Sequence, residues 1–302
     1  MTTTKFKHIH VIINPAAGQD EPVLNVLNSV LRPAEVKWEV FVTNAAGDAH
    51  KFAQQAIAAG VDAVAVYGGD GTVTEVAGGL LGSNMPLAIL PGGTANVMSI
   101  ELGIPPKLAD AVALVCDPSS EIRLIDMGMV NERPFFGHVA IGLEADMHLV
   151  ADRSMKDRYG FLAYPLAAFQ ALVDRPVARV MLKMDAEMVE MDILNCMVTN
   201  LGSIGMFGAS MANNISVSDG LLDVILIRNT DIASIGDLVS SVTGQPNQLP
   251  HWQVHTVNIR TDPVQRVTAD GEVLGTTPVD IRVLPNAIRV IVPASAAPKG
   301  AA

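Results

Sequence analysis

The stretch VDAVAVYGGDGTVTEV (residues 61–76) decides the fold that the sequence predicts. It begins with a run of Val and Ala, which is typical of a strand buried on both faces, and it ends in a helical pattern that carries Glu75. Between the two lies the turn GGDGT (68–72). A buried strand, a glycine turn and a helix in this order form the repeating element of an α/β domain with a parallel sheet.

The same order of elements recurs on both sides of this stretch. Strand-like runs occur at 8–14, 36–43, 61–68 and 86–91, and helical patterns occur at 47–60, 71–82 and 108–117. Because the strands are apolar on both faces, helices are expected to cover both sides of the sheet. The sequence therefore predicts a three-layer, parallel-sheet α/β domain over residues 1–124.

The remainder of the chain is predicted to form a β-rich second domain over residues 125–293. The runs EIRLIDMGMV (121–130) and FFGHVAIG (135–142) are expected to pair as antiparallel neighbours, and strand patterns dominate from about residue 177 onward. One helical pattern lies within this part, at 159–173. The tail from 294 to 302 is expected to be disordered.

Composition limits the class of protein. With 302 residues, 49% of them apolar, the chain can bury a large core, and its net charge of -11 argues against binding to nucleic acid. The segment at the N-terminus lacks the pattern of a signal peptide, and no apolar run is long enough to cross a bilayer. We expect a cytoplasmic protein with reduced cysteines, Cys116 and Cys196, and with at most peripheral membrane contact.

Three loops of small residues are the candidate ligand site. NPAAG (14–18), GGDGT (68–72) and PGGTAN (91–96) follow the first, third and fourth predicted strands, so all three are expected at the carboxyl edge of the sheet. Glycine backbones before helix N-termini form a cradle for phosphate. The carboxylate of Asp70 would repel a bare phosphate, and its presence is explained if it holds Mg²⁺. Thr94 is expected to cap the following helix or to donate to a phosphate.

Taken together, NPAAG, GGDGTVTEV and LPGGTAN resemble the diacylglycerol kinase catalytic domain of bacterial lipid kinases and sphingosine kinases. The resemblance continues through IDMG (125–128), SDGLLDV (218–224) and ADGE (269–272). It implies a nucleotide-binding α/β domain and a β-sandwich domain, with ATP and lipid meeting in the cleft. Val97 departs from the pattern, because related sequences usually carry Asp there. GGDGT alone also occurs in NAD kinases and phosphofructokinases.

The loops and the resemblance together give a set of expected site residues. Those expected to bind the nucleotide are Asn14, Pro15, Ala16, Ala17, Gly18, Thr43, Gly68, Gly69, Asp70, Gly71, Thr72, Glu75, Gly92, Gly93 and Thr94. By themselves the acids of ADGE are typical of a hairpin turn with solvated side chains. The resemblance implies instead that Glu272, or as second choice Asp270, accepts the proton of the lipid hydroxyl, with Asp70 on the opposite wall of the cleft.

The resemblance also implies a structural Mg²⁺ site. Its ligands would be the Asp219 carboxylate and the carbonyl oxygens of Ser216 and Leu221, although an ordinary Asp-Gly turn explains this segment equally well. His251 and His255, four residues apart, are interpreted as structural or surface residues.

The function predicted from the sequence is that of an ATP- and Mg²⁺-dependent lipid kinase of phospholipid metabolism, with diacylglycerol as the favoured substrate. The alternatives are an NAD kinase-like enzyme and a catalytically silent regulator that binds nucleotide or lipid, for which Val97 is the sequence hint. The region 151–180 carries five cations around an apolar helix, so it is either a membrane-surface helix or part of the core. A homodimer is compatible with the composition.

Overall fold

The computed structural model describes residues 5–17, 21–142, 145, 177–185, 187–204, 209–210, 215–228 and 249–294. The chain forms two compact units. Unit 1 comprises Met1–Met127, Leu201–Asp219 and Leu284–Ala302, and unit 2 comprises Gly128–Asn200 and Gly220–Val283. The sequence predicts two continuous domains instead, at 1–124 and 125–293. In the structure, segments from the second half of the chain complete the unit that the first half begins.

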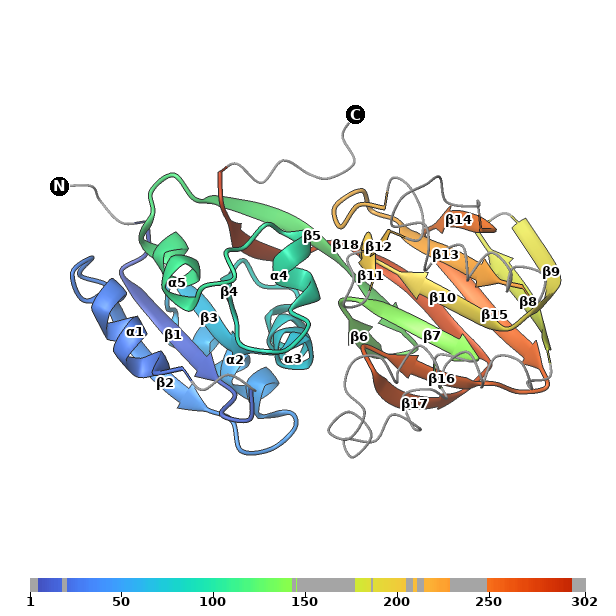
Figure 1. Ribbon diagram of the computed structural model, residues 1–302, viewed down its shortest axis with the longest axis horizontal. Coiled ribbons are helices and arrows are strands. Elements are labelled where there is room, and N and C mark those ends of the chain that lie inside the picture. Colours follow the sequence, from blue (N-terminus) through green and yellow to red (C-terminus); the bar gives the residue numbers. More distant parts are fainter. Residues whose placement is uncertain are drawn as a thin grey trace. The chain divides into compact units, whose positions relative to one another are not determined.

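Unit 1 is the α/β unit, and its elements alternate as the sequence predicts (Figure 1). In chain order they are β1 (His8–Ile13), α1 (Val23–Leu31), β2 (Lys37–Val42), α2 (Asp48–Ala59), β3 (Ala63–Gly68), α3 (Asp70–Leu80), β4 (Pro86–Pro91), α4 (Val97–Glu101), α5 (Leu108–Cys116) and the start of β5 (Glu121–Val130). The pair β11 (Ser203–Ile204) and β12 (Ala209–Ser210) also belongs to it. The expected strands and helices are confirmed to within about two residues, the usual uncertainty of element boundaries.

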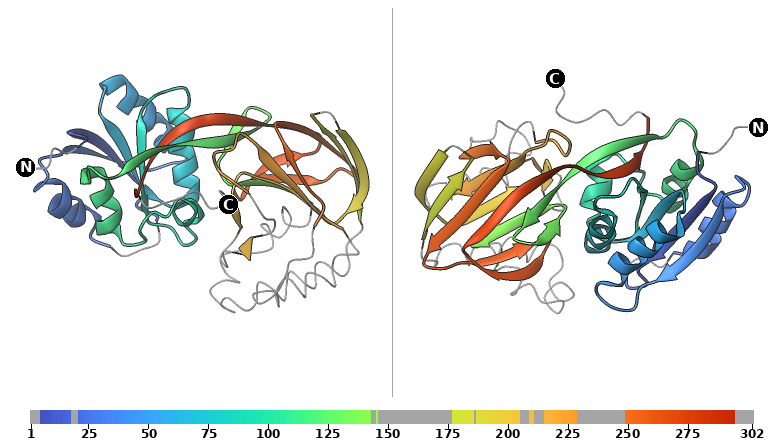
Figure 2. Two further views of the ribbon diagram at one scale, coloured as in Figure 1. Left: turned by 90° about the horizontal axis from the view of Figure 1, so that it is seen from above. Right: turned by 180° about the vertical axis from the view of Figure 1, so that it is seen from behind.

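The sheet of unit 1 is parallel, with the order β2-β1-β3-β4. The end of β18 (Val279–Val292) extends it, because Arg289 and Val290 pair in parallel with β4. Right-handed crossovers place α1 on one face of the sheet, and α2 and α3 on the other, because the chain reverses its direction across the sheet after β2. The helices can be followed in Figure 2. Strand β3 is buried at every position, as a strand covered on both faces should be.

Unit 2 is an antiparallel β sandwich. One of its sheets contains β8 (Ala178–Met184), β9 (Glu187–Ile193), β15 (Thr256–Asp262) and the first part of β18. The other has the order β14 (His251–Val254), β13 (Leu222–Ile227), β10 (Asn195–Thr199), β7 (His138–Gly142), β16 (Arg266–Ala269) and β17 (Glu272–Thr276). Alternate residues of β8 are buried, which shows one apolar face packed on the core and one polar face outside. The predicted fold class is therefore confirmed in both of its parts.

One predicted strand pairing, that of the runs 121–130 and 135–142, is confirmed at Phe135 but is wrong for residues 138–142. The end of β5 pairs with the short strand β6 (Arg133–Phe135), and Gly128 lies opposite Phe135. The run at 138–142 forms β7, which pairs with β10 and β16 in the other sheet. The sequence shows two apolar runs around a turn, but their hydrophobic pattern does not distinguish the sheet that each run joins.

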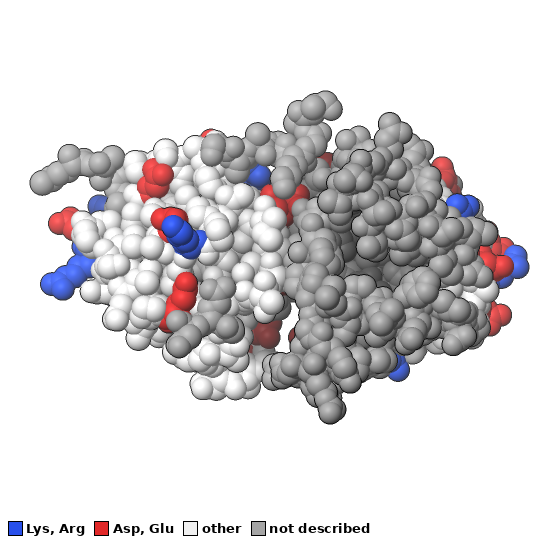
Figure 3. All heavy atoms as spheres, viewed as in Figure 1, with Lys and Arg blue, Asp and Glu red and all other residues white. Residues whose placement is uncertain are grey.

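Several predictions fall outside the described residues. They are Gly18, the helical pattern at 159–173 with most of its flanking cations, and most of the tail. Among the helices that the structure describes, none combines the length and the apolar character that spanning a bilayer requires. On the face drawn in Figure 3, charged side chains of the described residues are scattered over a largely uncharged surface.

Burial sets the protonation of three groups. Cys196 is buried in β10, and burial raises the pKa of its thiol to about 12, while the pKa of the half-buried Cys116 is also raised by burial. Both are free thiols, as expected. Burial lowers the pKa of His10 on β1, which favours its neutral form.

Candidate active site

The three glycine-containing loops begin side by side at the carboxyl edge of the unit 1 sheet. The backbone N–H of Asn14 donates to the carbonyl of Tyr67 (2.9 Å), and that of Gly92 donates to the carbonyl of Gly68 (3.0 Å). These bonds continue the parallel ladder one step beyond β1, β3 and β4. The loops that the sequence predicts to act together therefore lie next to one another, at the edge where α/β sheets bind ligands.

The glycines of the second and third loops pack backbone against backbone. A Cβ atom added to Gly93 would lie 2.5 Å from Cα of Gly69, and one added to Gly68 would lie 2.7 Å from Cβ of Thr72. A Cβ on Gly92 would meet the ring of Tyr67 at 2.8 Å. A side chain is thus sterically excluded at these three glycines, so their backbone can approach a phosphate closely.

Asn14 and Thr72 connect the first loop to the second. The Asn14 side-chain amide donates to the Thr72 hydroxyl (2.9 Å), and its carbonyl oxygen accepts the N–H of Ala16 (2.9 Å). Thr72 is buried. Its hydroxyl therefore fixes the geometry of the two loops, in addition to any role at a ligand. Pro15 and Ala17 lie in the same turn of the first loop.

Asp70 is the first residue of α3, where the helix N-terminus presents partial positive charge. Its carboxylate accepts the N–H of Met98 in the first turn of α4, at 3.3 Å. The same acid thus connects the helices that follow the second and third loops. Gly71, beside it, is exposed and has open space around its Cα.

Glu75 and Thr43 hold the loop that follows β2. The Glu75 carboxylate accepts the N–H of Gly47 (3.0 Å), which has a left-handed φ of 85° at the start of α2. Thr43 bonds to the carbonyl of Ile13 through its N–H (2.9 Å) and its hydroxyl (3.5 Å). In the same loop, N–H groups of Asn44 and Ala45 lower the pKa of Asp48.

The expected cap on the third loop is wrong. Thr94 is exposed, and the residue at the N-terminal boundary of α4 is Asn96, with a left-handed φ of 47°. The Asn96 side chain accepts the N–H of Gly93 (2.9 Å) and donates to the carbonyl of the same glycine (2.8 Å). Asn tolerates this conformation better than most residues, which is the sequence signal that could have identified it.

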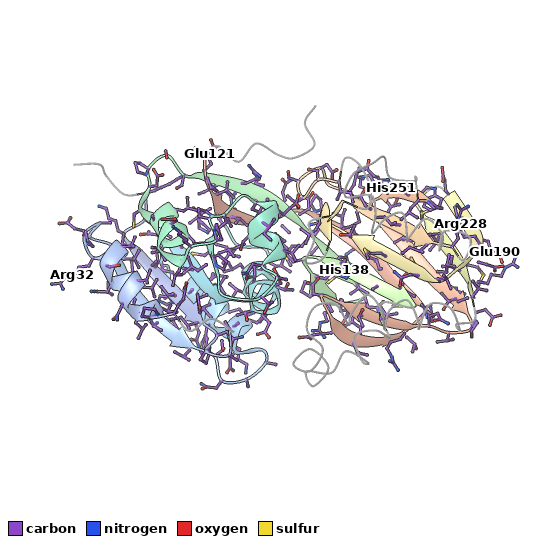
Figure 4. The ribbon with its side chains drawn as sticks, viewed as in Figure 1. Arg32, Glu121, His138, Glu190, Arg228 and His251 are labelled. Atoms are coloured by element: carbon purple, nitrogen blue, oxygen red, sulfur yellow. The ribbon has the colours of Figure 1, made fainter. Side chains whose placement is uncertain are left out.

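Asp270 and Glu272 lie on the hairpin between β16 and β17. Asp270 and Gly271 form its two-residue turn, with φ of 47° and 82°, as in a type I′ turn. The turn was predicted, but Asp270 is not a solvated acid. Its carboxylate accepts the N–H groups of Phe136 (2.9 Å), Gly137 (2.9 Å) and His138 (3.0 Å), the last at the start of β7 (Figure 4).

Glu272 is more accessible than Asp270. Its side chain is 60% exposed and forms an ion pair with the Arg133 guanidinium on β6. Arg133 was not among the expected site residues, because it is far from Glu272 in the sequence and belongs to a strand that was not predicted. The two acids of the ADGE segment therefore have different surroundings. Asp270 binds backbone N–H groups, and Glu272 binds the exposed side chain of Arg133.

The expected metal ligands Ser216, Asp219 and Leu221 lie in the irregular segment before β13. Gly220 adopts a left-handed φ of 77° there. The carbonyl of Val217 accepts the N–H of Asp126 (2.8 Å), which holds this segment against β5.

Asp126 itself is fully buried, and its carboxylate accepts the N–H of Asn286 (2.6 Å). The sequence marks Asp126 only as part of IDMG, and no local signal predicts its burial beside the segment that contains Val217. A buried carboxylate close to oxygen-donating backbone is chemically compatible with a hard cation such as Mg²⁺.

His251 and His255, which the sequence indicates to be structural or surface residues, each have an acidic neighbour. His251 on β14 lies 2.6 Å from the Asp223 carboxylate (Figure 4), and His255 lies 3.3 Å from that of Asp185. Each pair contains one His and one acid, which agrees with a structural role.

Models of two known domain families match this chain. The model of the diacylglycerol kinase catalytic domain matches residues 8–130, and that of the YegS C-terminal NAD kinase beta sandwich-like domain matches residues 137–292. A diacylglycerol kinase of Bacillus subtilis is 27% identical over 300 residues, which cover 95% of this chain and 97% of the relative. An uncharacterized protein of Synechocystis is 29% identical over 96% of this chain and 71% of its own length.

Solved structures agree as well. The crystal structure of a diacylglycerol kinase from Bacillus anthracis superimposes with a TM-score of 0.82 and 30% identity, over 96% of this chain and 98% of that one. The family models together span both units. This chain therefore belongs to the diacylglycerol kinase-like family of lipid kinases.

Proposed function

We propose that this chain transfers the γ-phosphoryl group of ATP to the hydroxyl of a membrane lipid, with diacylglycerol as the leading acceptor. The observation that carries the proposal is the close approach of the Gly68-Gly69 and Gly92-Gly93 backbones next to Asp70, the first residue of α3. Such a surface is suited to a polyphosphate that approaches with its cation. Membership of a lipid kinase family supports the same reaction class.

Neutralisation of the phosphate charge is assigned to backbone N–H groups and to a metal. The loops contain no Lys, so the partial positive charge at the start of α3 and a cation held by Asp70 are the groups that remain. Mg²⁺ fits a carboxylate oxygen better than it fits nitrogen or sulfur, and when bound it would offset charge on the transferred group. A second Mg²⁺ at Ser216, Asp219 and Leu221 would have a structural role.

Glu272 is proposed as the group that accepts the proton of the acceptor hydroxyl. In the transfer, the lipid oxygen forms a bond to the γ-phosphorus, the bond from that phosphorus to the β,γ-bridging oxygen breaks, and ADP leaves. The hydroxyl proton passes to a carboxylate. Both oxygens of Asp270 already accept backbone N–H groups, whereas Glu272 is exposed, and this supports Glu272 over Asp270.

The function is tested by incubating the full-length chain with Mg²⁺, ATP and a total lipid extract, and by reading phosphorylated products with mass spectrometry. Diacylglycerol in mixed micelles and NAD are assayed in parallel. We expect phosphatidic acid from diacylglycerol and no phosphorylated NAD. Phosphorylation of NAD alone would favour the NAD kinase alternative, and ATP binding without any product would favour a silent regulator, for which Val97 is the sequence hint.

Two variants test the roles proposed for Asp70 and Glu272. Asp70→Asn retains an oxygen for the N–H of Met98 but removes the charge, so kcat/KM is expected to fall by about 100-fold or more. Glu272→Gln is expected to lower kcat by about 100-fold or more while ATP affinity is retained. Product formation that survives both changes would contradict these assignments. Sedimentation with vesicles tests the proposed peripheral contact with the membrane.

A further inference from the structure

A cluster of two histidines and one acid lies on the parallel sheet of unit 1, away from the glycine loops. His8 and His10 are two residues apart on β1, so their side chains lie on the same face of the sheet. Glu39 on β2 is the register partner of His10. One ligand-type atom from each of the three side chains lies within 4.8 Å of the other two. Among the described residues, no second group of this kind is found.

The imidazole of His10 is the unusual member of this cluster. The residue is 4% exposed, and its Nδ1 has no hydrogen-bond partner in the described part of the chain. Its ring packs against Phe41 at 4.6 Å between ring centroids, and Phe41 in turn packs against Phe52 of α2. A buried ring nitrogen without a partner has lost its hydrogen bonds to water and has gained no other. A bound ion is one of the few groups that can supply the missing interaction.

The other two side chains are already in contact. Nε2 of His8 lies 3.0 Å from Oε1 of Glu39, and the two side chains are 31% and 47% exposed, so solvent reaches the cluster from this side. Lys37 also approaches Oε1 of Glu39, at 3.1 Å. The Lys37 side chain is 67% exposed, so its ammonium group can move into solvent when a cation replaces it.

Two imidazoles and one carboxylate are the donors that borderline transition-metal ions prefer, and Mg²⁺ does not prefer them. Three such ligands with one side open to solvent match the pattern of Zn²⁺ with a bound water. We propose that His8, His10 and Glu39 bind a divalent transition-metal ion, Zn²⁺ first among them, and that this ion ties the edge strand β2 to β1.

The position of the cluster separates it from the kinase site. His8 begins β1, whereas the glycine loops follow the ends of the strands, so the cluster lies toward the opposite edge of the sheet. From His8 to Asn14 a strand rises by roughly 20 Å, at about 3.3 Å per residue. Among the strands that the structure describes, β1 is the one neighbour with which β2 pairs. A metal that bridges the two strands therefore stabilises the least supported strand of the parallel sheet.

The test uses the full-length chain after dialysis against a chelator. Zn²⁺ is titrated by calorimetry with excess Mg²⁺ present, so that oxygen-donor sites are occupied. We expect one tight equivalent of Zn²⁺ and a higher unfolding temperature with Zn²⁺ than without it. Loss of a group that only orients a ligand already weakens metal binding by roughly 10–100-fold, so His8→Gln and Glu39→Gln should each cost at least about tenfold in affinity.

Controls separate the cluster from general damage. His8 and Glu39 are partly exposed, so these variants should fold, and circular dichroism checks that they do. His255→Gln removes a histidine beside an acid in unit 2 and should leave Zn²⁺ affinity unchanged. Lys37→Met removes the competing ammonium group and should bind Zn²⁺ at least as tightly as the natural chain.

Cobalt provides an independent readout of the ligands. Co²⁺ in place of Zn²⁺ should give the visible spectrum of a four-coordinate site without a thiolate charge-transfer band. The proposal is overturned if the tight equivalent is absent, if it persists in both His8→Gln and Glu39→Gln, if Lys37→Met binds more weakly, or if a thiolate band shows that Cys116 or Cys196 holds the metal.

Discussion

Gly69 and Gly93 are in contact through their backbones: a Cβ atom on Gly93 would come within 2.5 Å of Cα of Gly69. Neither backbone can move away, because the loops are also joined by the bond from the Gly92 N–H to the Gly68 carbonyl. Gly93→Ala is therefore expected to lower the free energy of unfolding by about 1–3 kcal/mol and to abolish product formation. Urea denaturation and the lipid assay measure the two effects.

Gly71→Ala is the matched control for that change. Gly71 lies in the first turn of α3, and an added Cβ meets nothing within 4 Å. Ala is a better helix former than Gly, so the unfolding midpoint should stay the same or rise slightly. Equal destabilisation by both changes would mean that packing between the loops does not explain the effect at Gly93.

The hydrogen bond between the side chains of Asn14 and Thr72 should contribute to stability. Thr72→Val keeps the shape of the side chain but removes the acceptor of the Asn14 amide, so the free energy of unfolding should fall by about 1–2 kcal/mol. Thr72→Ser retains the hydroxyl and should lose less. In a double-mutant cycle with Asn14→Ala, the two effects should be clearly non-additive. Additive effects would show that the bond contributes nothing.

The two acids of the β16–β17 hairpin should respond differently to neutralisation. Asp270→Asn replaces a carboxylate that accepts three N–H groups, so the free energy of unfolding should fall by about 2–3 kcal/mol. Glu272→Gln changes an exposed group and should alter stability by less than about 1 kcal/mol. Denaturation of both variants beside the natural chain checks this contrast.

Arg133→Gln is the matched control for the change Glu272→Gln. It removes the same ion pair but leaves the carboxylate in place, so phosphoryl transfer should be largely retained. If Arg133→Gln and Glu272→Gln lower kcat equally, the carboxylate acts through the ion pair and not as a proton acceptor.

Ionisation of Asp185 should make the free energy of unfolding depend on pH. The N–H groups of His255 and Thr256 and the Thr256 hydroxyl hold the pKa of its carboxyl at about 2, below the usual 3.8. Because the folded-state pKa is the lower one, the stabilisation is complete above about pH 4 and is lost as the pH falls from about 4 toward 2.

Asp185→Asn removes this stabilisation. Since the side chain is 38% exposed, the variant should be less stable by only about 1 kcal/mol at neutral pH. The difference between the two proteins in urea should shrink as the pH approaches 2. A difference that is constant with pH would contradict the assignment.

Much of the fold was predictable because the signals are local. The run at 63–68 carries no charged residue, and a parallel strand between two helical layers requires that pattern, so β3 appears where the sequence places it. The pairing of β7 was not predictable. Its run at 138–142 carries the same apolar signal as a neighbour of β5 would, and the choice of sheet depends on packing across the sandwich.

The candidate site also has a part that the sequence predicts and a part that it does not. Glycines before helices identify the three loops. The sequence predicts that Thr94 caps the following helix or donates to a phosphate, but the residue at the N-terminal boundary of α4 is Asn96, because either residue type can end a loop. Likewise, Asp270 and Glu272 differ only in their long-range partners, the backbone at 136–138 and Arg133. Partners more than a hundred residues away leave no trace in local pattern.

Strand β18 determines how this chain can be divided. Its first residues pair with β15 in the sandwich, while Arg289 and Val290 pair with β4 in the α/β unit. A fragment that ends at residue 130, where the first family match stops, would expose the free edge of β4 to solvent and to other chains. Proteolysis or a nonsense mutation that removes the end of β18 would accordingly destabilise the α/β unit, although most of that unit is encoded at the other end of the gene.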